Sequence, residues 1–179
     1  MANALTALRL LAVAPAAWAF AHAGTVPAWQ LAVLVIVAIA SDLLDGRVAR
    51  RLGTASPGGM LFDHSTDCLF VTSGLAGAAT AGLLPVALPI LVPIAFSQYV
   101  LDSYFLHRQR QLRMSSLGRW NGIFYFAPLV MIAIAALGLP LLSELARVLV
   151  YPCGALLAVS TVASIIDRAA APLRVTSVR

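Results

Sequence analysis

Four aspartates that lie close together in the chain could carry out chemistry: Asp42, Asp45, Asp63 and Asp67. The 179 residues include only seven acidic side chains, so more than half of them fall within this short stretch. Each of the four lies near one end of an apolar segment. An aspartate at the centre of a membrane helix costs about 2.5 to 3.5 kcal/mol, and four together also repel one another. A compensating positive charge is therefore expected beside them.

The spacing of the aspartates predicts where they point. Asp42 and Asp45 are three residues apart and share one face of a helix, and Asp63 and Asp67, four apart, share a face of the next helix. A short turn with Gly and Pro, residues 53–58, joins the two helices, so they should pack antiparallel. Their polar faces then converge on one pocket.

Divalent cations are the natural partners of such a pocket. Two Mg²⁺ or Mn²⁺ ions would balance four carboxylates, whereas zinc or copper would favour His or Cys ligands. Gly46, Ala49 and Gly59 keep the faces free of bulky side chains, so a substrate can approach the backbone. Arg50 can bind phosphate oxygens with its forked guanidinium. Helix-pairing salt bridges could explain one or two of the acids, but so few basic residues lie nearby that they cannot explain four. This combination predicts a pyrophosphate site.

The segment from Asp42 to Arg50, followed after eight residues by Gly59 to Asp67, resembles the motif of the CDP-alcohol phosphotransferase family. That motif is D-x-x-D-G-x-x-A-R, eight residues, then G-x-x-x-D-x-x-x-D, and all eight defining positions match. Phosphatidylglycerophosphate and cardiolipin synthases usually have L-D-P-x-A-D-K over the last two aspartates, where this chain has Phe62 to Cys68 as F-D-H-S-T-D-C. The aspartates are kept, but neither subfamily is assigned.

The resemblance implies a role for each matching residue. The ligands of the two metal ions would be Asp42, Asp45, Asp63 and Asp67. The CDP group would be bound by Asp42, Gly46, Ala49, Arg50, Gly59 and Asp63. Asp67 would also be the catalytic base that takes the proton of the acceptor hydroxyl. The family's six-helix architecture and its homodimers are expected here as well.

The composition predicts the elements that hold these residues. Hydrophobic residues make up 61% of the chain, charged residues only 11%, and the mean hydropathy is +0.92. A soluble domain would be nearer a quarter charged. We therefore expect one all-α integral membrane domain over residues 1–179. Its six transmembrane helices are expected at about 3–21, 28–51, 59–82, 85–107, 119–137 and 141–167.

The basic residues, all of them arginines, predict the orientation. They cluster in the second-to-third loop, the fourth-to-fifth loop and the C-terminal tail, which places these segments and both termini on the cytoplasmic side. The site would then face the cytoplasm, in a bacterial-type inner membrane. Because the clusters separate apolar segments, they indicate topology, and no nucleic-acid partner is expected. A cleaved signal peptide ending near Ala21-His22-Ala23 is disfavoured, because Arg9 lies inside the apolar segment and not before it.

Several polar residues outside the motif allow more than one interpretation. Asn3, Thr6 and Arg9 could brace the aspartates, contact nucleotide phosphate or anchor the first helix at the interface. Asp102 could pair with an arginine such as Arg9. His64 lies about 100° from the face of the aspartates, which favours a packing or hydrogen-bonding role over metal ligation.

Two arginines and two glycines outside the motif also suggest specific roles. A phosphorylated acceptor could be bound by Arg113 and Arg119, although topology alone also explains these charges. Gly74 and Gly77 indicate a close helix contact, which could be the dimer face.

These observations predict an enzyme of phospholipid biosynthesis. It would transfer a phosphatidyl group from CDP-diacylglycerol to a small alcohol, with glycerol 3-phosphate or an inositol phosphate favoured, and release CMP. An alternative is transfer of a phospho-head-group from another CDP-alcohol to diacylglycerol. A cation or proton transporter is a more distant alternative, because intramembrane acids often mark ion paths.

Overall fold

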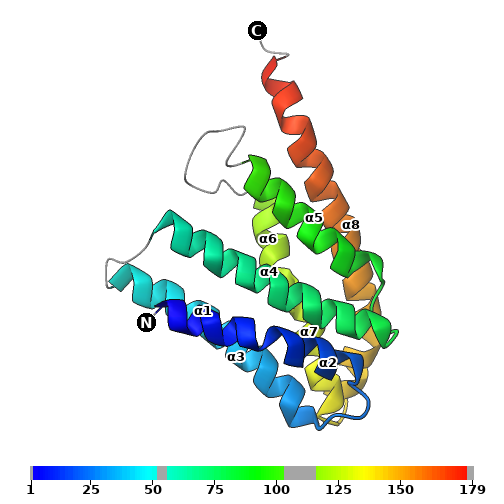
Figure 1. Cartoon of the computed structure of the whole chain (residues 1–179). Coiled ribbons are helices and arrows are strands. Elements are labelled where there is room, and N and C mark those ends of the chain that lie inside the picture. The colour runs from blue at the N-terminus through cyan, green and yellow to red at the C-terminus, as the bar shows by residue number, and fades with distance from the viewer. Residues whose placement is uncertain (1, 52–55, 103–115, 177–179) are drawn as a thin grey trace.

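The structure, a computed structural model, describes residues 2–51, 56–102 and 116–176, and these residues form helices joined by short turns. Figure 1 labels the helices in chain order. Their bounds are α1 Ala2–Leu11, α2 Val13–Ala21, α3 Ala28–Arg51, α4 Pro57–Thr80, α5 Ala87–Leu101, α6 Ser116–Phe124, α7 Phe126–Ala136 and α8 Leu142–Thr176. The prediction of an all-helical chain is confirmed over the described residues.

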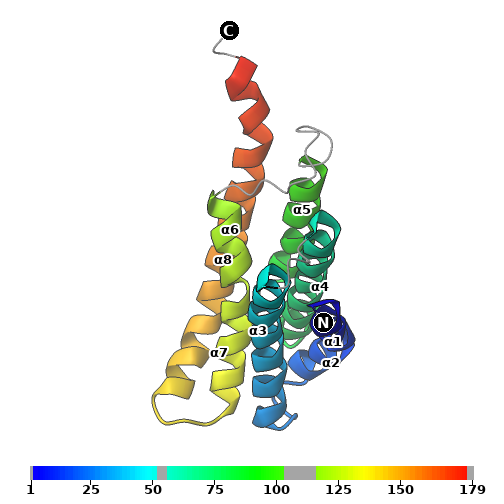
Figure 2. The ribbon, with the colours of Figure 1, turned by 90° about the vertical axis from the view of Figure 1, so that its left-hand side faces the viewer.

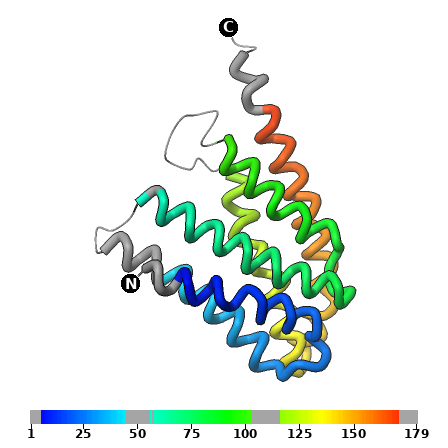
Figure 3. The backbone as a smooth tube through the Cα atoms, viewed as in Figure 1, coloured from blue at the N-terminus to red at the C-terminus, as the bar shows by residue number. Residues whose placement is uncertain are grey.

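The helices run back and forth, so that alternate connections lie at the same end of the molecule. The α2–α3, α4–α5 and α7–α8 turns lie together at the lower end in Figures 1 and 2. The ends of α3, α5 and α8 and the starts of α4 and α6 lie at the other end, and the antiparallel course of α3 and α4 can be followed in Figure 3. The arginine-rich segments of the sequence are therefore attached to one end of the bundle.

Two helices that the sequence predicts as continuous are interrupted. The first is divided at Ala12 into α1 and α2, and the fifth at Tyr125 into α6 and α7. In each case a proline, Pro15 or Pro128, follows three residues later. A proline has no N–H to donate to the carbonyl four residues before it, so the hydrogen-bond ladder breaks at this point. The prolines account for these local breaks, and Thr6–Ala21 and Ser116–Ala136 each remain one apolar helical segment, in agreement with the predicted first and fifth helices.

The predicted breaks between helices coincide with turns of the structure. Gly82 and Gly138 have positive φ angles of 74° and 67°, which glycine adopts without steric cost at the end of a helix. At the start of α4, the Ser56 hydroxyl accepts a hydrogen bond from the Gly59 N–H at 3.1 Å, and Pro57 occupies the first turn. This cap fixes where α4 begins, six residues before Asp63.

The tightest helix contact joins α2 to α4. A Cβ atom added at Gly77 would overlap the carbonyl oxygen of Ala17 and lie 2.9 Å from the Ala21 nitrogen. At Gly74 it would lie 3.1 Å from Leu129 of α7. The close contact that these glycines indicate is confirmed, but it lies inside one chain. The suggestion that they form a dimer face was wrong, because α2 and α7 of the same molecule cover them.

The outer surface carries many large apolar side chains. Leu11, Trp29, Ile36, Val148 and Leu156 are each more than 60% exposed, as expected where lipid covers the helices. By length and composition, two segments among the described residues can span a membrane, Ser116–Ala136 and Leu142–Ala170. Shorter apolar helices cover Thr6–Ala21, Ala28–Leu44 and Ala87–Leu101. Six spans therefore remain a prediction.

Candidate active site

Arg9, on α1, lies at the centre of the acidic cluster. Its side chain is fully buried, and its Nη1 atom donates hydrogen bonds to Asp67 and, at 3.0 Å, to Asp63. The same nitrogen lies 3.9 Å from a carboxylate oxygen of Asp42. Its Nε atom donates to the Ser41 hydroxyl at 3.2 Å, which orients the guanidinium from the α3 side. One cation therefore contacts acidic side chains from two helices.

The position of α1 explains how Arg9 reaches both helices. α1 packs against α3 and against α4, whereas the direct contact between α3 and α4 is much smaller. The expectation that the two acidic helices pack directly against each other is only partly right, because α1 brings much of their acidic faces together. Of the three roles weighed for Arg9, bracing the aspartates is the one the structure shows. Interfacial anchoring does not fit a fully buried side chain.

The cluster is open to small ligands. The side chains of Asp63 and Asp67 are 20% and 22% exposed, and that of Asp42 is 40% exposed. Carboxylates that were only structural partners of Arg9 would not need this access. The arrangement thus combines a buried cation with partly accessible oxygen ligands.

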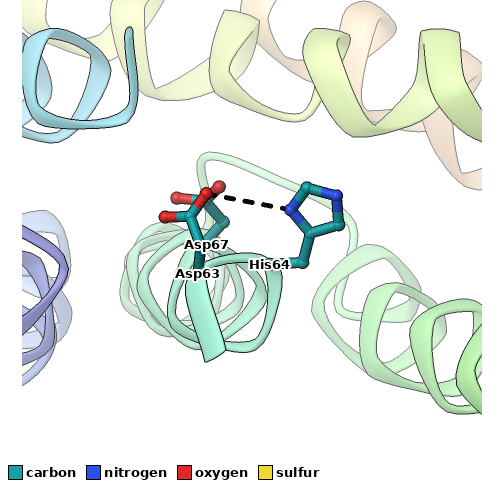
Figure 4. Close-up of side chains that lie close together, drawn as sticks. All are labelled: Asp63, His64 and Asp67. Atoms are coloured by element: carbon teal, nitrogen blue, oxygen red, sulfur yellow. Dashed lines mark ion pairs between the residues drawn. The ribbon is translucent and has the colours of Figure 1, made fainter. Parts of the chain in front are cut away.

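His64 also belongs to this cluster. Its Nδ1 atom lies 4.0 Å from an Asp63 carboxylate oxygen, and one ligand atom from each of Asp63, His64 and Asp67 lies within 4.8 Å of the others. Figure 4 shows the imidazole beside the two carboxylates, all three carried by α4. These three residues could hold a metal ion. The offset of one residue around the helix predicts that His64 points away from the aspartates, but its side chain bends back toward Asp63.

The other predicted site residues are less fully described. Asp45, Gly46, Ala49 and Arg50 belong to the last turns of α3, but their side chains lie outside the described part of the structure, as does Arg113 entirely. Arg119 is exposed near the start of α6. The structure brings Asp42, Asp63 and Asp67 together and leaves the contribution of the others as a prediction.

Comparison with known proteins identifies the family. A family model described as CDP-alcohol phosphatidyltransferase matches residues 1–166, which is most of the chain. The chain belongs to this family. It is therefore a transferase of substituted phosphate groups and a membrane protein.

One curated relative is a cardiolipin synthase (CMP-forming) from Streptomyces coelicolor. This transferase is 38% identical to it over 64 residues, a stretch that covers 36% of the chain and 29% of the relative. The match thus spans less than a third of the relative's own length. No solved structure matches the chain.

A second ion pair of the transferase lies between α5 and α8. Arg168 is 3.6 Å from a carboxylate oxygen of Asp102, and its guanidinium lies over the Tyr99 ring at 5.3 Å from the centroid. Gln98 donates a hydrogen bond to the Ile165 carbonyl at 3.2 Å beside this pair. The suggested pairing of Asp102 with Arg9 was wrong, because Arg9 points into the acidic cluster and Asp102 faces the last helix.

A set of polar residues between α6, α7 and α8 was missed by the sequence analysis. Ser160 donates a hydrogen bond to the Asn121 side-chain oxygen at 2.7 Å, and the hydroxyls of Tyr125 and Thr161 share one at 2.8 Å. Asn121 and Tyr125 are one turn apart, and Ser160 and Thr161 are adjacent. This spacing of polar residues in apolar helices was the available signal.

Proposed function

We propose that this transferase moves a phosphatidyl group from CDP-diacylglycerol to a small alcohol and releases CMP. Glycerol 3-phosphate or an inositol phosphate is the favoured acceptor. The main support is that Asp42 on α3 and Asp63 and Asp67 on α4 are gathered around the Arg9 guanidinium. The match of residues 1–166 to the family and the name of the curated relative, a CMP-forming synthase, agree with this reaction.

The donor atoms of the cluster suit hard divalent cations. They are carboxylate oxygens with one imidazole nitrogen alongside, a set that fits Mg²⁺ or Mn²⁺. We propose that Asp42, Asp45, Asp63 and Asp67 hold two such ions. When bound, they would polarise the phosphoryl group and stabilise the CMP leaving group.

Within this proposal, the chain's own residues bind the donor and move a proton. Asp67 accepts the proton of the acceptor hydroxyl as that oxygen attacks the phosphorus atom, and the bond from phosphorus to CMP breaks. The CDP group is bound by Asp42, Gly46, Ala49, Arg50, Gly59 and Asp63. Arg9 holds Asp63 and Asp67 in place through the contacts described above.

The membrane placement is also a proposal. The arginine-rich segments all adjoin the end of the bundle at which α3 ends and α4 begins, in agreement with a site that faces the cytoplasm of a bacterial-type inner membrane. Arg119, near the start of α6, lies at the same end, and it is proposed to contact the phosphate of the acceptor together with Arg113. A homodimer remains an expectation from the family.

Incubation of the purified protein with labelled CDP-diacylglycerol and an acceptor panel tests the proposal. CMP release together with a new phospholipid is expected, and cardiolipin is looked for among the products because of the curated relative. Product formed only from a CDP-linked head group and diacylglycerol would support the alternative pairing. Ion flux in vesicles without any CMP release would contradict both.

A further inference from the structure

The buried amide of Asn121 has more hydrogen-bonding capacity than the surrounding protein uses. The residue is 3% exposed, its side-chain oxygen accepts from Ser160, and its Nδ2 atom has no partner among the described residues. If the amide were turned over, its nitrogen would face Ser160 and its oxygen would lack a partner instead. One end is left unsatisfied in either orientation, which is unfavourable in a buried position. A ligand that forms a hydrogen bond with the unsatisfied end of the amide would explain this unfavourable arrangement.

Helix association alone does not account for this residue. The neighbouring pair, Tyr125 and Thr161, links the same helices by a hydrogen bond, and Thr161 also donates to the Leu157 carbonyl. No side-chain polar atom of that pair is left buried without a partner. A serine or threonine at position 121 could join α6 to α8 by the same kind of hydrogen bond without leaving a buried polar atom unpaired.

Asn121 lies on the inner face of its helix. It shares this face with Tyr125, one turn later, and both are buried, whereas Gly122, Ile123 and Phe124 are exposed. Both side chains form hydrogen bonds with α8, Asn121 with Ser160 and Tyr125 with Thr161. The face that carries Asn121 therefore contacts α8, and α7, the helix that follows α6, packs against α4, the helix of the acidic cluster.

The depth of Asn121 in the bundle matches that of the cluster. The rings of Phe70 on α4 and Phe126 on α7 stack at 6.3 Å, which sets the two helices in register. α4 and α6–α7 run in the same direction in Figures 1 and 2. By the helical rise, His64 lies about 9 Å before Phe70, and Asn121 lies about 8 Å before Phe126. In Figure 4 the side chains of the cluster stand on the side of α4 that faces the yellow-green α6–α7 segment.

We propose that the free end of the Asn121 amide binds a hydroxyl group of the acceptor alcohol and thereby favours a polyol. This inference rests on the proposed function. A hydroxyl both donates and accepts, so it can pair with either end of an amide. Because the amide is neutral, it suits a hydroxyl better than a phosphate, for which the chain offers arginines.

The substitution Asn121→Leu tests the proposal with two readouts. Leucine has a similar size and carries no polar atom, so Asn121→Leu removes the unsatisfied amide together with the hydrogen bond from Ser160. Because the Ser160 hydroxyl belongs to a residue that is only partly buried, these two effects should nearly cancel and the melting temperature should change little. The KM for glycerol 3-phosphate or myo-inositol 1-phosphate should rise about five- to ten-fold, which corresponds to about 1 kcal/mol for one neutral hydrogen bond. The KM for CDP-diacylglycerol should not change.

Two comparisons make the test specific. Tyr125→Phe removes the neighbouring interhelical hydrogen bond and should lower the melting temperature without changing the KM for the acceptor. The wild-type protein should prefer glycerol 3-phosphate to propane-1,3-diol phosphate, which lacks the secondary hydroxyl. Asn121→Leu should lose this preference. If myo-inositol 1-phosphate proves to be the acceptor, its deoxy analogues take the place of the diol phosphate.

The failure of this inference can be distinguished from that of the proposed function. Absence of CMP release from the wild-type protein with either acceptor would contradict the proposed function and this inference with it. CMP release by the wild-type protein, with an unchanged KM for the acceptor in Asn121→Leu, would overturn the role of Asn121 alone. A lower melting temperature with that unchanged KM would assign the residue to helix packing.

Discussion

Arg9 on α1 and Asp67 on α4 form an ion pair in which the arginine is fully buried. The same guanidinium also contacts Asp63 and approaches Asp42. One positive charge thus faces three carboxyl groups, so the acidic cluster can accept further positive charge. The first helix, which carries no part of the D-x-x-D motif, is therefore an integral part of the candidate site.

Replacement of Arg9 by glutamine should destabilise the transferase. Removing one partner of a buried ion pair costs about 3 to 5 kcal/mol, because the remaining charges lose their compensation. The three carboxylates would then repel one another, so Mn²⁺ should raise the melting temperature of the variant more than that of the wild-type protein. Thermal unfolding in detergent, with and without Mn²⁺, measures both effects.

Arg147→Gln is the matched control for this substitution. Arg147 pairs with Glu144 on the surface of α8, and both side chains are more than half exposed. An exposed pair contributes only about 0 to 1 kcal/mol, so the control should unfold close to the wild-type temperature. Equal losses in the two variants would show that Arg9 has no special role.

Replacement of Asp67 by asparagine should abolish most of the activity. A general base contributes about 10²- to 10⁴-fold to the rate, and an amide cannot take the proton. The asparagine side-chain oxygen can still accept the hydrogen bond from Arg9, so the variant should remain folded by circular dichroism. The rate of CMP release measures the effect, and a rate near that of the wild-type protein would exclude Asp67 as the base.

Asp102→Asn is the control for Asp67→Asn, because it also removes an acidic side chain from an apolar helix. Asp102 pairs with Arg168 between α5 and α8 and has no role in the proposed mechanism. We expect this variant to unfold at a lower temperature, because a partly buried ion pair is lost, but to release CMP at close to the normal rate. A large loss of CMP release would link the α5–α8 contact to the site.

Removal of divalent cations should stop the reaction. The cluster offers oxygen ligands and the His64 imidazole, so chelation with EDTA should eliminate CMP release, and excess Mg²⁺ or Mn²⁺ should restore it. Asp63→Asn should require a higher Mn²⁺ concentration for half-maximal activity, since one ligand is weakened. Full activity of the wild-type protein in EDTA would contradict the metal proposal.

The sequence predicts those features that depend on residues close together in the chain. The four-residue spacing of Asp63 and Asp67 places both on one face of α4, and Gly82 and Gly138 end helices where they were expected to. Contacts between distant helices could not be predicted in this way. Helical periodicity shows which face of a helix is polar but not which neighbour covers that face.

Arg9 and Asp102 illustrate this limit. Both were recognised as unusual charges in apolar helices, but their partners depend on how α1 and α8 pack. The alternative roles of Arg9 could be separated only when its burial against α3 and α4 was known. The unsatisfied amide of Asn121 was missed for the same reason, because whether a buried polar atom has a hydrogen-bond partner depends on which residues surround it in the fold.

The α2–α4 contact gives a final prediction, which compares two glycine-to-alanine substitutions. At Gly77 a Cβ atom would overlap the Ala17 carbonyl oxygen, so Gly77→Ala must push α2 away from α4 and should lower the melting temperature. At Gly122, within α6, the added atom meets nothing within 4 Å. Alanine is favoured over glycine inside a helix by about 1 kcal/mol, so Gly122→Ala should be neutral or stabilising. Because α2 continues from α1, displacement of α2 should also move Arg9, and Gly77→Ala should release CMP more slowly at temperatures at which it is still folded. Equal melting temperatures for the two variants would mean that α2 and α4 do not pack as closely as the structure shows.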